Sequence, residues 1–406
     1  GKQILGGDFI QQNLRLCRMS SAACKGLSKL GESCLQRRQE PRAYAIACET
    51  LVKIGRVFYP RHAALHQPRP QVRAGNRKQR PVVGDAVAHP ARGHGRQPGQ
   101  ASAARQRKQQ GLNLIVGVLC RGHCLLEGVP GVAKSLAVET LATVVGGSSV
   151  RLQFTPDLVP SDIVGTRIYR PSQEAFDVEL GPVFANLVLA DEINRAPAKV
   201  QSALLEVMAE RQVSIGGTTY PLPSPFLVLA TQNPIESEGV YPLPEAQRDR
   251  FLMKIEVGHP SMAEEMEIVR RMAVSPPHAE QVLTLGELIE LQEVVDTTFV
   301  HHAVAEYAVR LVMATREPAR WGLPALAPQV AHGASPRGSL GLVRGAKALA
   351  VLRGRDYVLP VDVSDLTVDV LAHRLVLTYE ALADEVSAPS VVAQVLERGD
   401  PPPPLA

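Results

Sequence analysis

The chain has 406 residues, of which 45% are hydrophobic, and a formal net charge of +4 at pH 7. This length and hydrophobic content suffice for two or three globular domains with ordinary cores. No stretch reaches the roughly 18 consecutive apolar residues that a membrane-spanning helix needs, and the start lacks the charged-then-apolar pattern of a signal peptide. We therefore expect a cytoplasmic protein without membrane insertion.

The positive charge is concentrated in one segment. Residues 61–110 carry nine Arg and two Lys against a single acid, Asp85. They almost lack large apolar side chains, so burial there cannot offset the entropy lost on ordering. We predict that residues 1–110 form a basic, partly disordered extension without an assigned function. A cationic run of this kind can also bind nucleic acid.

Residues 111–275 show short apolar runs that alternate with helical segments. Apolar residues 112–119 and 124–126 precede a Gly-rich turn, which is typical of a buried strand that leads through a loop into a helix. Later apolar runs end in polar residues at Asp191 and Thr231. Such alternation predicts an α/β core with a parallel sheet flanked by helices, whose ligand-binding edge lies where the strands end.

The strand pattern disappears after about residue 280, where amphipathic helices follow. We expect a small all-helical domain over residues 280–385, with helices at 285–295, 303–315, 339–352 and 361–378. Residues 386–406 end in a Pro-rich stretch, and we expect them to form an extended tail.

A phosphate-binding loop is the first motif of the core. It follows a predicted strand, opens a helix, and consists of Gly128, Val129, Pro130, Gly131, Val132, Ala133, Lys134 and Ser135. Backbone N–H groups at a helix start can hold phosphate, while Lys134 reaches the outer phosphates and Ser135 ligates Mg²⁺. A Gly-rich turn followed by a surface lysine is the alternative when this motif is considered alone.

Two carboxylates then end a buried strand. Asp191 is placed to hold Mg²⁺ through water, and Glu192 to polarise the water that attacks the phosphate. Asn233 ends the next strand, where its amide can bind that water or the γ-phosphate. A helix cap for the acids and a turn for Asn233 are the structural alternatives. Beside a phosphate loop, the combination predicts an ATP site that uses Mg²⁺.

Arginines further along the chain suggest a site shared between subunits. Arg250 is placed to enter the ATP site of a neighbouring subunit, where its fixed charge would stabilise developing phosphate charge. A surface ion pair with Glu245 or Asp249 is the alternative to this role. Arg337 begins a helix of the second domain and would reach the γ-phosphate when that domain closes.

These motifs closely resemble those of the MoxR family of AAA+ ATPases, which carry an AAA+ P-loop core and a helical lid. The resemblance spans roughly residues 112–398 and includes Phe154–Asp162, Leu189–Pro197, Ala230–Pro234 and Ala334–Arg337. It implies Walker A at Gly128–Ser135, Walker B at Leu187–Glu192, sensor 1 at Asn233, an arginine finger at Arg250 and sensor 2 at Arg337.

The resemblance also implies partners. It indicates a hexameric homo-oligomeric ring that acts as a chaperone-like remodeller, with a von Willebrand factor A domain protein as partner. Two further segments resemble hairpins of this clade that face the pore, at residues 165–181 and 213–220. The chain departs from the family in two places. The family's Val-Gly-Gln segment, which helps to enclose adenine, has no match at residues 101–110. Arg248 stands where family members usually carry an apolar residue, which makes it a second candidate for the arginine finger.

Other functions remain open at this point. A nucleic-acid-acting motor would use the basic segment, although the core carries no helix-turn-helix or stacking motif. A motor like the magnesium chelatase subunits would need a porphyrin-binding partner. A non-hydrolysing, nucleotide-gated scaffold fits the missing adenine segment but not the presence of Lys134, Glu192 and Asn233.

Overall fold

The computed structural model describes residues 98–129, 131–132, 134–172, 174–234, 239–272 and 278–399. Most of the predicted basic extension therefore lies outside the described residues, as do Pro130, Ala133 and the prolines at 401–404. Among the described residues, none of the helices is both long and apolar enough to cross a membrane.

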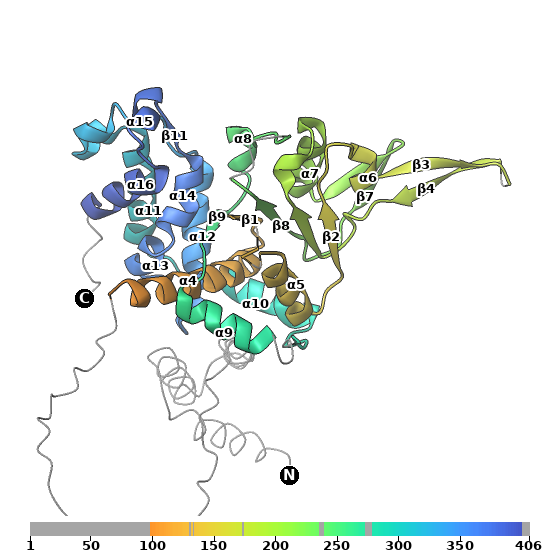
Figure 1. Ribbon diagram of the computed structural model, residues 1–406, viewed down its shortest axis with the longest axis horizontal. Helices are drawn as coiled ribbons and strands as arrows, with labels where there is room; N and C mark the ends of the chain where they lie inside the picture. Colours follow the sequence, from red (N-terminus) through yellow and green to blue (C-terminus); the bar gives the residue numbers. More distant parts are fainter. Residues whose placement is uncertain are drawn as a thin grey trace, which may run out of the picture.

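The core is a parallel sheet of five strands within the described residues, in the order β2-β5-β8-β1-β9 (Figure 1). The strands are β1 (Cys124–Gly128), β2 (Ser149–Gln153), β5 (Leu187–Asp191), β8 (Leu227–Gln232) and β9 (Met253–Val257). Every residue of β5 is buried, as are the first five of β8. A strand that is covered on both faces has a continuous run of apolar residues, and this pattern allowed β5 and β8 to be predicted from the sequence.

Successive residues of each strand enter two different cores. Leu187 and Leu189 pack with α5 (Lys134–Val145) and the end of α4 (Pro98–Leu119), whereas Val188 and Ala190 pack with α7 (Ala198–Glu210). This alternation follows from the two-residue period of a strand. The sheet is therefore covered by helices on both faces, as the sequence predicted.

Residues 112–119 correct one prediction. We expected them to belong to a buried strand, but they form the last turns of α4, and the strand begins only at Cys124. A short apolar run fits a buried helix and a buried strand equally well, and its periodicity does not separate them. Within the described residues, α4 therefore spans the boundary at residue 111 that we predicted for the core.

Two antiparallel hairpins extend from this core. β3 (Gly165–Arg170) pairs with β4 (Ala175–Leu180), and β6 (Gln212–Ile215) pairs with β7 (Thr218–Pro221). The second hairpin turns at Gly216 and Gly217, both with positive φ, which a two-residue turn of this kind requires. Both predicted hairpins are confirmed, and β3–β4 projects far from the body of the molecule (Figure 1).

Smaller helices complete the core. They are α6 (Pro160–Val164), the 3-10 turn η1 (Ile193–Arg195), α8 (Glu245–Arg248) and α9 (Met262–Met272).

The second domain is mainly helical. Its helices are α10 (Leu285–Thr297), α11 (His302–Arg316), α12 (Pro336–Leu352), α13 (Pro360–Ser364), α14 (Thr367–Leu371), α15 (Tyr379–Ala383) and α16 (Ala388–Arg398). Three 3-10 turns, η2 (Pro318–Trp321), η3 (Pro324–Leu326) and η4 (Ala372–Arg374), connect them, and a short ribbon joins β10 (Val330–His332) to β11 (Val376–Leu377).

Two boundaries in this domain differ from the prediction. The single helix expected at 361–378 is divided into α13, α14, η4 and β11. The expected tail at 386–406 contains α16, whose Val391, Val392 and Val395 are fully buried. The proline run had suggested extended chain, but it starts after this helix ends, so the domain continues to residue 398.

A buried polar contact joins α4 to the second domain. The amide of Asn113 on α4 donates to the carboxylate of Asp369 on α14 at 2.7 Å. Burial, followed by the nearby charge of Glu256, raises the pKa of Asp369 to about 6, against the opposing effect of Asn113. Because the pKa is raised on folding, the stability that Asp369 contributes is fully present when the pH lies below the pKa of the unfolded chain, near 4. This contribution is lost as the pH rises through 6.

We predict that Asp369→Asn stabilises the protein at pH 7.5 by up to about 3 kcal/mol, because the buried charge is removed while an acceptor for Asn113 remains. The gain should vanish as pH falls towards 4. Thermal unfolding of the wild type and of Asp369→Asn between pH 4 and 8 measures this gain in stability. A gain that is independent of pH would show that the charge of Asp369 is not responsible.

Candidate functional site

The predicted motifs meet in one pocket at the edge of the sheet where the strands end. The pocket is lined by residues from the phosphate loop, α5 and the ends of β2, β5 and β8, namely Gly131, Lys134, Ser135, Leu136, Arg151, Gln153, Asp191, Glu192, Thr231 and Asn233. Lys134, Ser135, Asp191, Glu192 and Asn233 were all singled out from the sequence. The pocket therefore brings together the predicted phosphate loop, the paired acids and the polar end of the next strand.

The phosphate loop depends on two glycines. A Cβ on Gly128 would lie 2.3 Å from the carbonyl oxygen of Val257, so only glycine allows β1 and β9 to approach so closely at this point. Gly131 has a φ of +81°, in the region that glycine adopts without strain. The Nζ of Lys134 donates to the carbonyl oxygens of Gly128, at 2.5 Å, and of Gln232, at 3.0 Å. These contacts hold the ammonium at the ends of β1 and β8.

Asp191 is the most heavily hydrogen-bonded acid of the pocket. Its Oδ1 accepts from the hydroxyl of Thr231 at 2.5 Å, and its Oδ2 accepts from the hydroxyl of Ser135 at 3.1 Å. Arg151 adds two bonds to Oδ2, from Nε at 3.1 Å and Nη2 at 2.7 Å. Burial acts to raise the pKa of Asp191, but these hydrogen bonds outweigh it, so the pKa is lowered and the carboxylate stays ionised.

Glu192 adopts an uncommon backbone conformation next to Asp191. Its φ and ψ are 57° and 48°, in the left-handed region, and its N–H donates to the hydroxyl of Thr231 at 2.9 Å. Its carboxylate accepts from Gln153 at 2.8 Å and pairs with Arg195 at 3.2 Å. Glu192 lines the pocket, and these two partners hold its carboxylate in place.

Asn233 follows β8 at the floor of the pocket, where its side chain is 3% exposed. Its carbonyl oxygen accepts from the side chain of Asn194 at 3.2 Å. This contact links the segment after β8 to the segment after β5.

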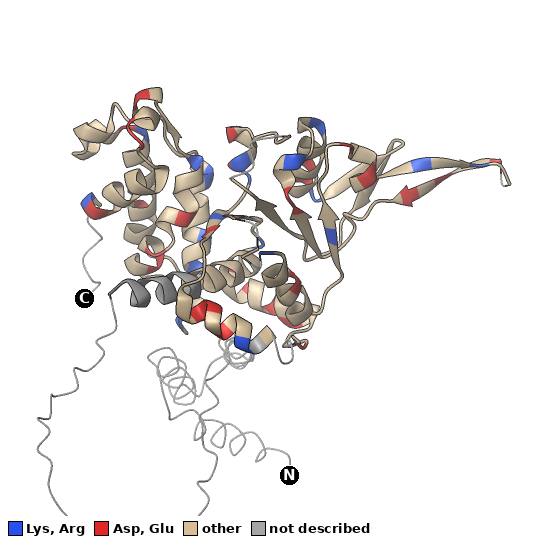
Figure 2. Cartoon of the chain, viewed as in Figure 1, with Lys and Arg blue, Asp and Glu red and all other residues tan. Residues whose placement is uncertain are grey.

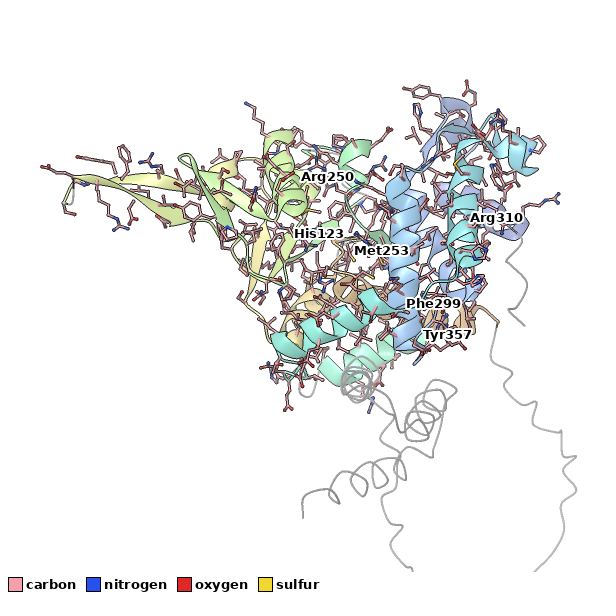
Figure 3. All side chains as sticks on the ribbon, turned by 180° about the vertical axis from the view of Figure 1, so that it is seen from behind. His123, Arg250, Met253, Phe299, Arg310 and Tyr357 are labelled. Atoms are coloured by element: carbon pink, nitrogen blue, oxygen red, sulfur yellow. The ribbon has the colours of Figure 1, made fainter. Side chains whose placement is uncertain are left out.

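None of the three predicted arginines lines the pocket of its own chain. Arg250 is exposed, and its Nη1 donates to the carbonyl oxygen of Leu205 on α7 at 2.6 Å. Figure 3 places it on the core beside α7. Arg337 lies at the start of α12, where its Nη1 pairs with Asp249 at 3.2 Å. These positions leave a role for Arg250 in a neighbouring site open, and they place Arg337 at the boundary between the two domains.

Asp249 connects the core to the second domain. Besides Arg337, it accepts from the hydroxyl of Ser335 at 2.8 Å and from Nε of Arg374 at 3.0 Å. The side chain of Arg374 is only 3% exposed, and burial lowers its pKa to about 10, against the opposing effect of Asp249. Arg374 also donates to the carbonyl oxygens of Phe251 and Leu252. The segment that carries Arg250 is thus tied to the helix start that carries Arg337.

Sequence reasoning missed Arg151, Gln153, Thr231 and the Asp249–Arg374 pair. The first two alternate along β2, immediately before Phe154–Asp162, so they share one face of the strand that neighbours β5. That alternation was the available signal. The Asp249–Arg374 pair joins residues 125 positions apart, and nothing local in the sequence indicates it.

Comparison with known proteins agrees with this geometry. Residues 123–253 match the model of the ATPase family associated with various cellular activities (AAA), and residues 325–395 match an AAA lid domain. The chain is 66% identical over 284 residues to Chaperone MoxR1 of Mycobacterium tuberculosis, an alignment that covers 70% of this chain and 75% of that protein. The chain belongs to the MoxR family of AAA+ ATPases.

Other relatives support the same family. Protein MoxR of Paracoccus denitrificans is 34% identical over 65% of this chain and 83% of its own length. A crystal structure of a proposed ATPase from Cytophaga hutchinsonii superposes with a TM-score of 0.68 and 44% identity, covering 75% of this chain and 96% of the other. The MoxR chain described here therefore has an AAA+ core with a five-stranded parallel sheet, followed by an AAA lid, as the sequence predicted.

We predict that Asp249→Ala destabilises the protein by about 3–5 kcal/mol, because it leaves the buried Arg374 without its counter-charge. Urea denaturation followed through the first unfolding transition measures this. The matched control is Glu317→Ala, which breaks the exposed pair with Arg320 and should cost about 0–1 kcal/mol. Equal effects of the two substitutions would contradict a structural role for the Asp249–Arg374 pair.

Proposed function

We propose that this MoxR protein hydrolyses ATP to ADP and phosphate at the pocket between Gly131 and Asn233, using Mg²⁺. The observation that carries the proposal is the meeting of Lys134, Ser135, Asp191 and Glu192 at one edge of the sheet. A cation, a hydroxyl and two carboxylates in this arrangement suit a bound nucleoside triphosphate and its metal. Membership of the AAA+ family supports the same activity.

The residues present fit a magnesium ion. Ser135 and Asp191 supply oxygen atoms, which Mg²⁺ prefers, and they already lie within hydrogen-bond distance of each other. When bound, the ion would neutralise charge on the outer phosphates. Lys134, in the first turn of α5, would contribute its ammonium to binding the same phosphates. The N-terminus of α5 would add the positive end of its helix dipole.

Glu192 is the proposed general base. Its carboxylate lies beside Asp191 and is 29% exposed, so a water molecule can reach it. To polarise that water, the carboxylate must either break its hydrogen bond with Gln153 or accept hydrogen bonds from Gln153 and the water together. Asn233 would position the same water or the γ-phosphate from the neighbouring strand end.

We further propose that six copies form a ring in which Arg250 completes the site of the adjacent subunit. The exposure of Arg250 and its absence from its own pocket support action across an interface. Arg337 would act within its own chain when the lid closes, after exchanging Asp249 for phosphate. The proposed result of the cycle is remodelling of a partner protein, which fits the similarity to Chaperone MoxR1.

The hairpin β3–β4 is the proposed contact with a client. It carries Ile168, Tyr169, Phe176 and Leu180, which are 40–61% exposed. Exposed aromatic and aliphatic side chains on a projecting hairpin are typical of a protein-binding surface. We propose that a von Willebrand factor A domain protein assists this step, as the resemblance to the MoxR family implies.

A nucleic-acid motor and a motor like magnesium chelatase are less well supported. In the cartoon of Figure 2, the segments coloured blue for Lys and Arg and red for Asp and Glu are interspersed over the core and lid, whereas a nucleic-acid-binding face is usually rich in Lys and Arg. A non-hydrolysing scaffold would not need Glu192 beside Asp191.

We predict that Glu192→Gln lowers steady-state phosphate release by about 10²–10⁴-fold, because the general base is lost. Binding of ATP should persist, since Lys134 and Asp191 are unchanged. The matched control, Glu206→Gln, removes a carboxylate from the exposed side of α7 and should leave the rate unaltered. Full activity of Glu192→Gln would overturn the proposed mechanism.

A mixing experiment tests the shared site. Arg250→Ala and Glu192→Gln should each be inactive alone, but mixed rings should recover activity, because some interfaces then combine an intact Glu192 with an intact Arg250. The same mixing experiment with Arg248→Ala in place of Arg250→Ala shows which of the two arginines acts between subunits. A mixture that stays as inactive as its components would exclude Arg250 as a residue acting between subunits.

A further inference from the structure

Arg151 places a positive charge on the acid that is proposed to hold the metal. Its guanidinium donates twice to Oδ2 of Asp191, at 2.7 and 3.1 Å. The hydroxyl of Ser135 donates to the same oxygen at 3.1 Å. The guanidinium is thus bound to the one carboxylate oxygen that also contacts Ser135, the second proposed metal ligand.

The hydrogen bonds leave Asp191 little capacity for another partner. A carboxylate offers about four acceptor positions. Thr231 donates to Oδ1, while Ser135 and Arg151 supply three donors to Oδ2. A hydrated cation that approaches Oδ2 must therefore displace Arg151, which it also repels electrostatically.

A second carboxylate is ready to receive the displaced arginine. Nη1 of Arg151 lies 3.9 Å from Oε1 of Glu139 on α5. Arg151 and Glu139 have side chains that are 52% and 54% exposed, whereas Asp191 is only 8% exposed. The guanidinium therefore stands between a buried acid and an exposed one, and it can change partner by a small rotation into solvent.

We propose that Arg151 competes with the metal for Oδ2 of Asp191, and that it transfers from Asp191 to Glu139 when the metal and nucleotide bind. This inference rests on the proposed function, because it assumes that Asp191 and Ser135 hold a metal. Arg151 is a positioning residue that orients the carboxylate of Asp191. It makes metal binding a competition between two cations for one oxygen.

The test is a titration with Mn²⁺ in the presence of saturating ADP, followed by the loss of the free-ion electron paramagnetic resonance signal. Arg151→Gln should lower the half-saturating Mn²⁺ concentration by about three- to tenfold, because the competing charge is removed and the site is partly exposed. Glu139→Gln should raise that concentration, because Arg151 then has no second carboxylate. Both shifts should shrink at high salt.

Arg310→Gln is the matched control. It removes the same charge from a partly exposed pair with Glu306 on the lid, remote from the sheet in Figure 3. Its titration should coincide with that of the wild type. An Arg151→Gln curve that is unshifted, or shifted to weaker binding, would overturn the inference while leaving the proposed function intact. Absence of Mn²⁺ binding by the wild type would instead reject both.

Discussion

The site depends on the common edge at which neighbouring parallel strands end. Gln153 of β2 lies opposite Asp191 of β5, and Leu126 of β1 lies opposite Thr231 of β8. This register brings the phosphate loop, the paired acids and Asn233 to one place without any long loop. Several of the side chains that hold Asp191 and Glu192 come from the adjacent strands, namely Arg151 and Gln153 of β2 and Thr231 of β8. The rigidity of the sheet is thereby transmitted to the two acids.

The same edge explains the electrostatic balance of the pocket. Asp191 is buried, which alone would favour its protonated form, yet the hydroxyl of Thr231 and the charge of Arg151 keep it ionised. The ammonium of Lys134 donates to the backbone carbonyl oxygens of Gly128 and Gln232. A pocket built in this way holds cations and anions at fixed positions, as transfer of a phosphoryl group to water requires.

A second cluster connects this edge to the lid. Asp249 contacts Ser335, Arg337 and Arg374, all from the lid, and it immediately precedes Arg250 on the core. Any movement of the lid would therefore act on the segment that carries Arg250. In the proposed ring, this contact would link the lid of one subunit to the neighbouring site.

Much of the core was predictable because its polar residues follow buried apolar runs directly. The phosphate loop, Asp191 and Asn233 all stand where a strand ends, so local pattern and chemistry agree. Residues 112–119 were assigned wrongly because a short apolar run does not distinguish a helix from a strand, and α16 was missed because the prolines beyond it dominated the pattern. The alternation of Arg151 and Gln153 indicated a shared strand face, but not that this strand lies beside β5. Arg374 gains its role only from a contact between domains, which the sequence does not display.

Equilibrium binding of a fluorescent ATP analogue with Mg²⁺, compared between the wild type and Lys134→Ala, tests the central claim that this edge binds nucleotide. We predict saturable binding by the wild type and at least about tenfold weaker binding by Lys134→Ala, because an ammonium at the phosphate position is lost. Equal affinity of the two proteins, or no binding by either, would contradict it.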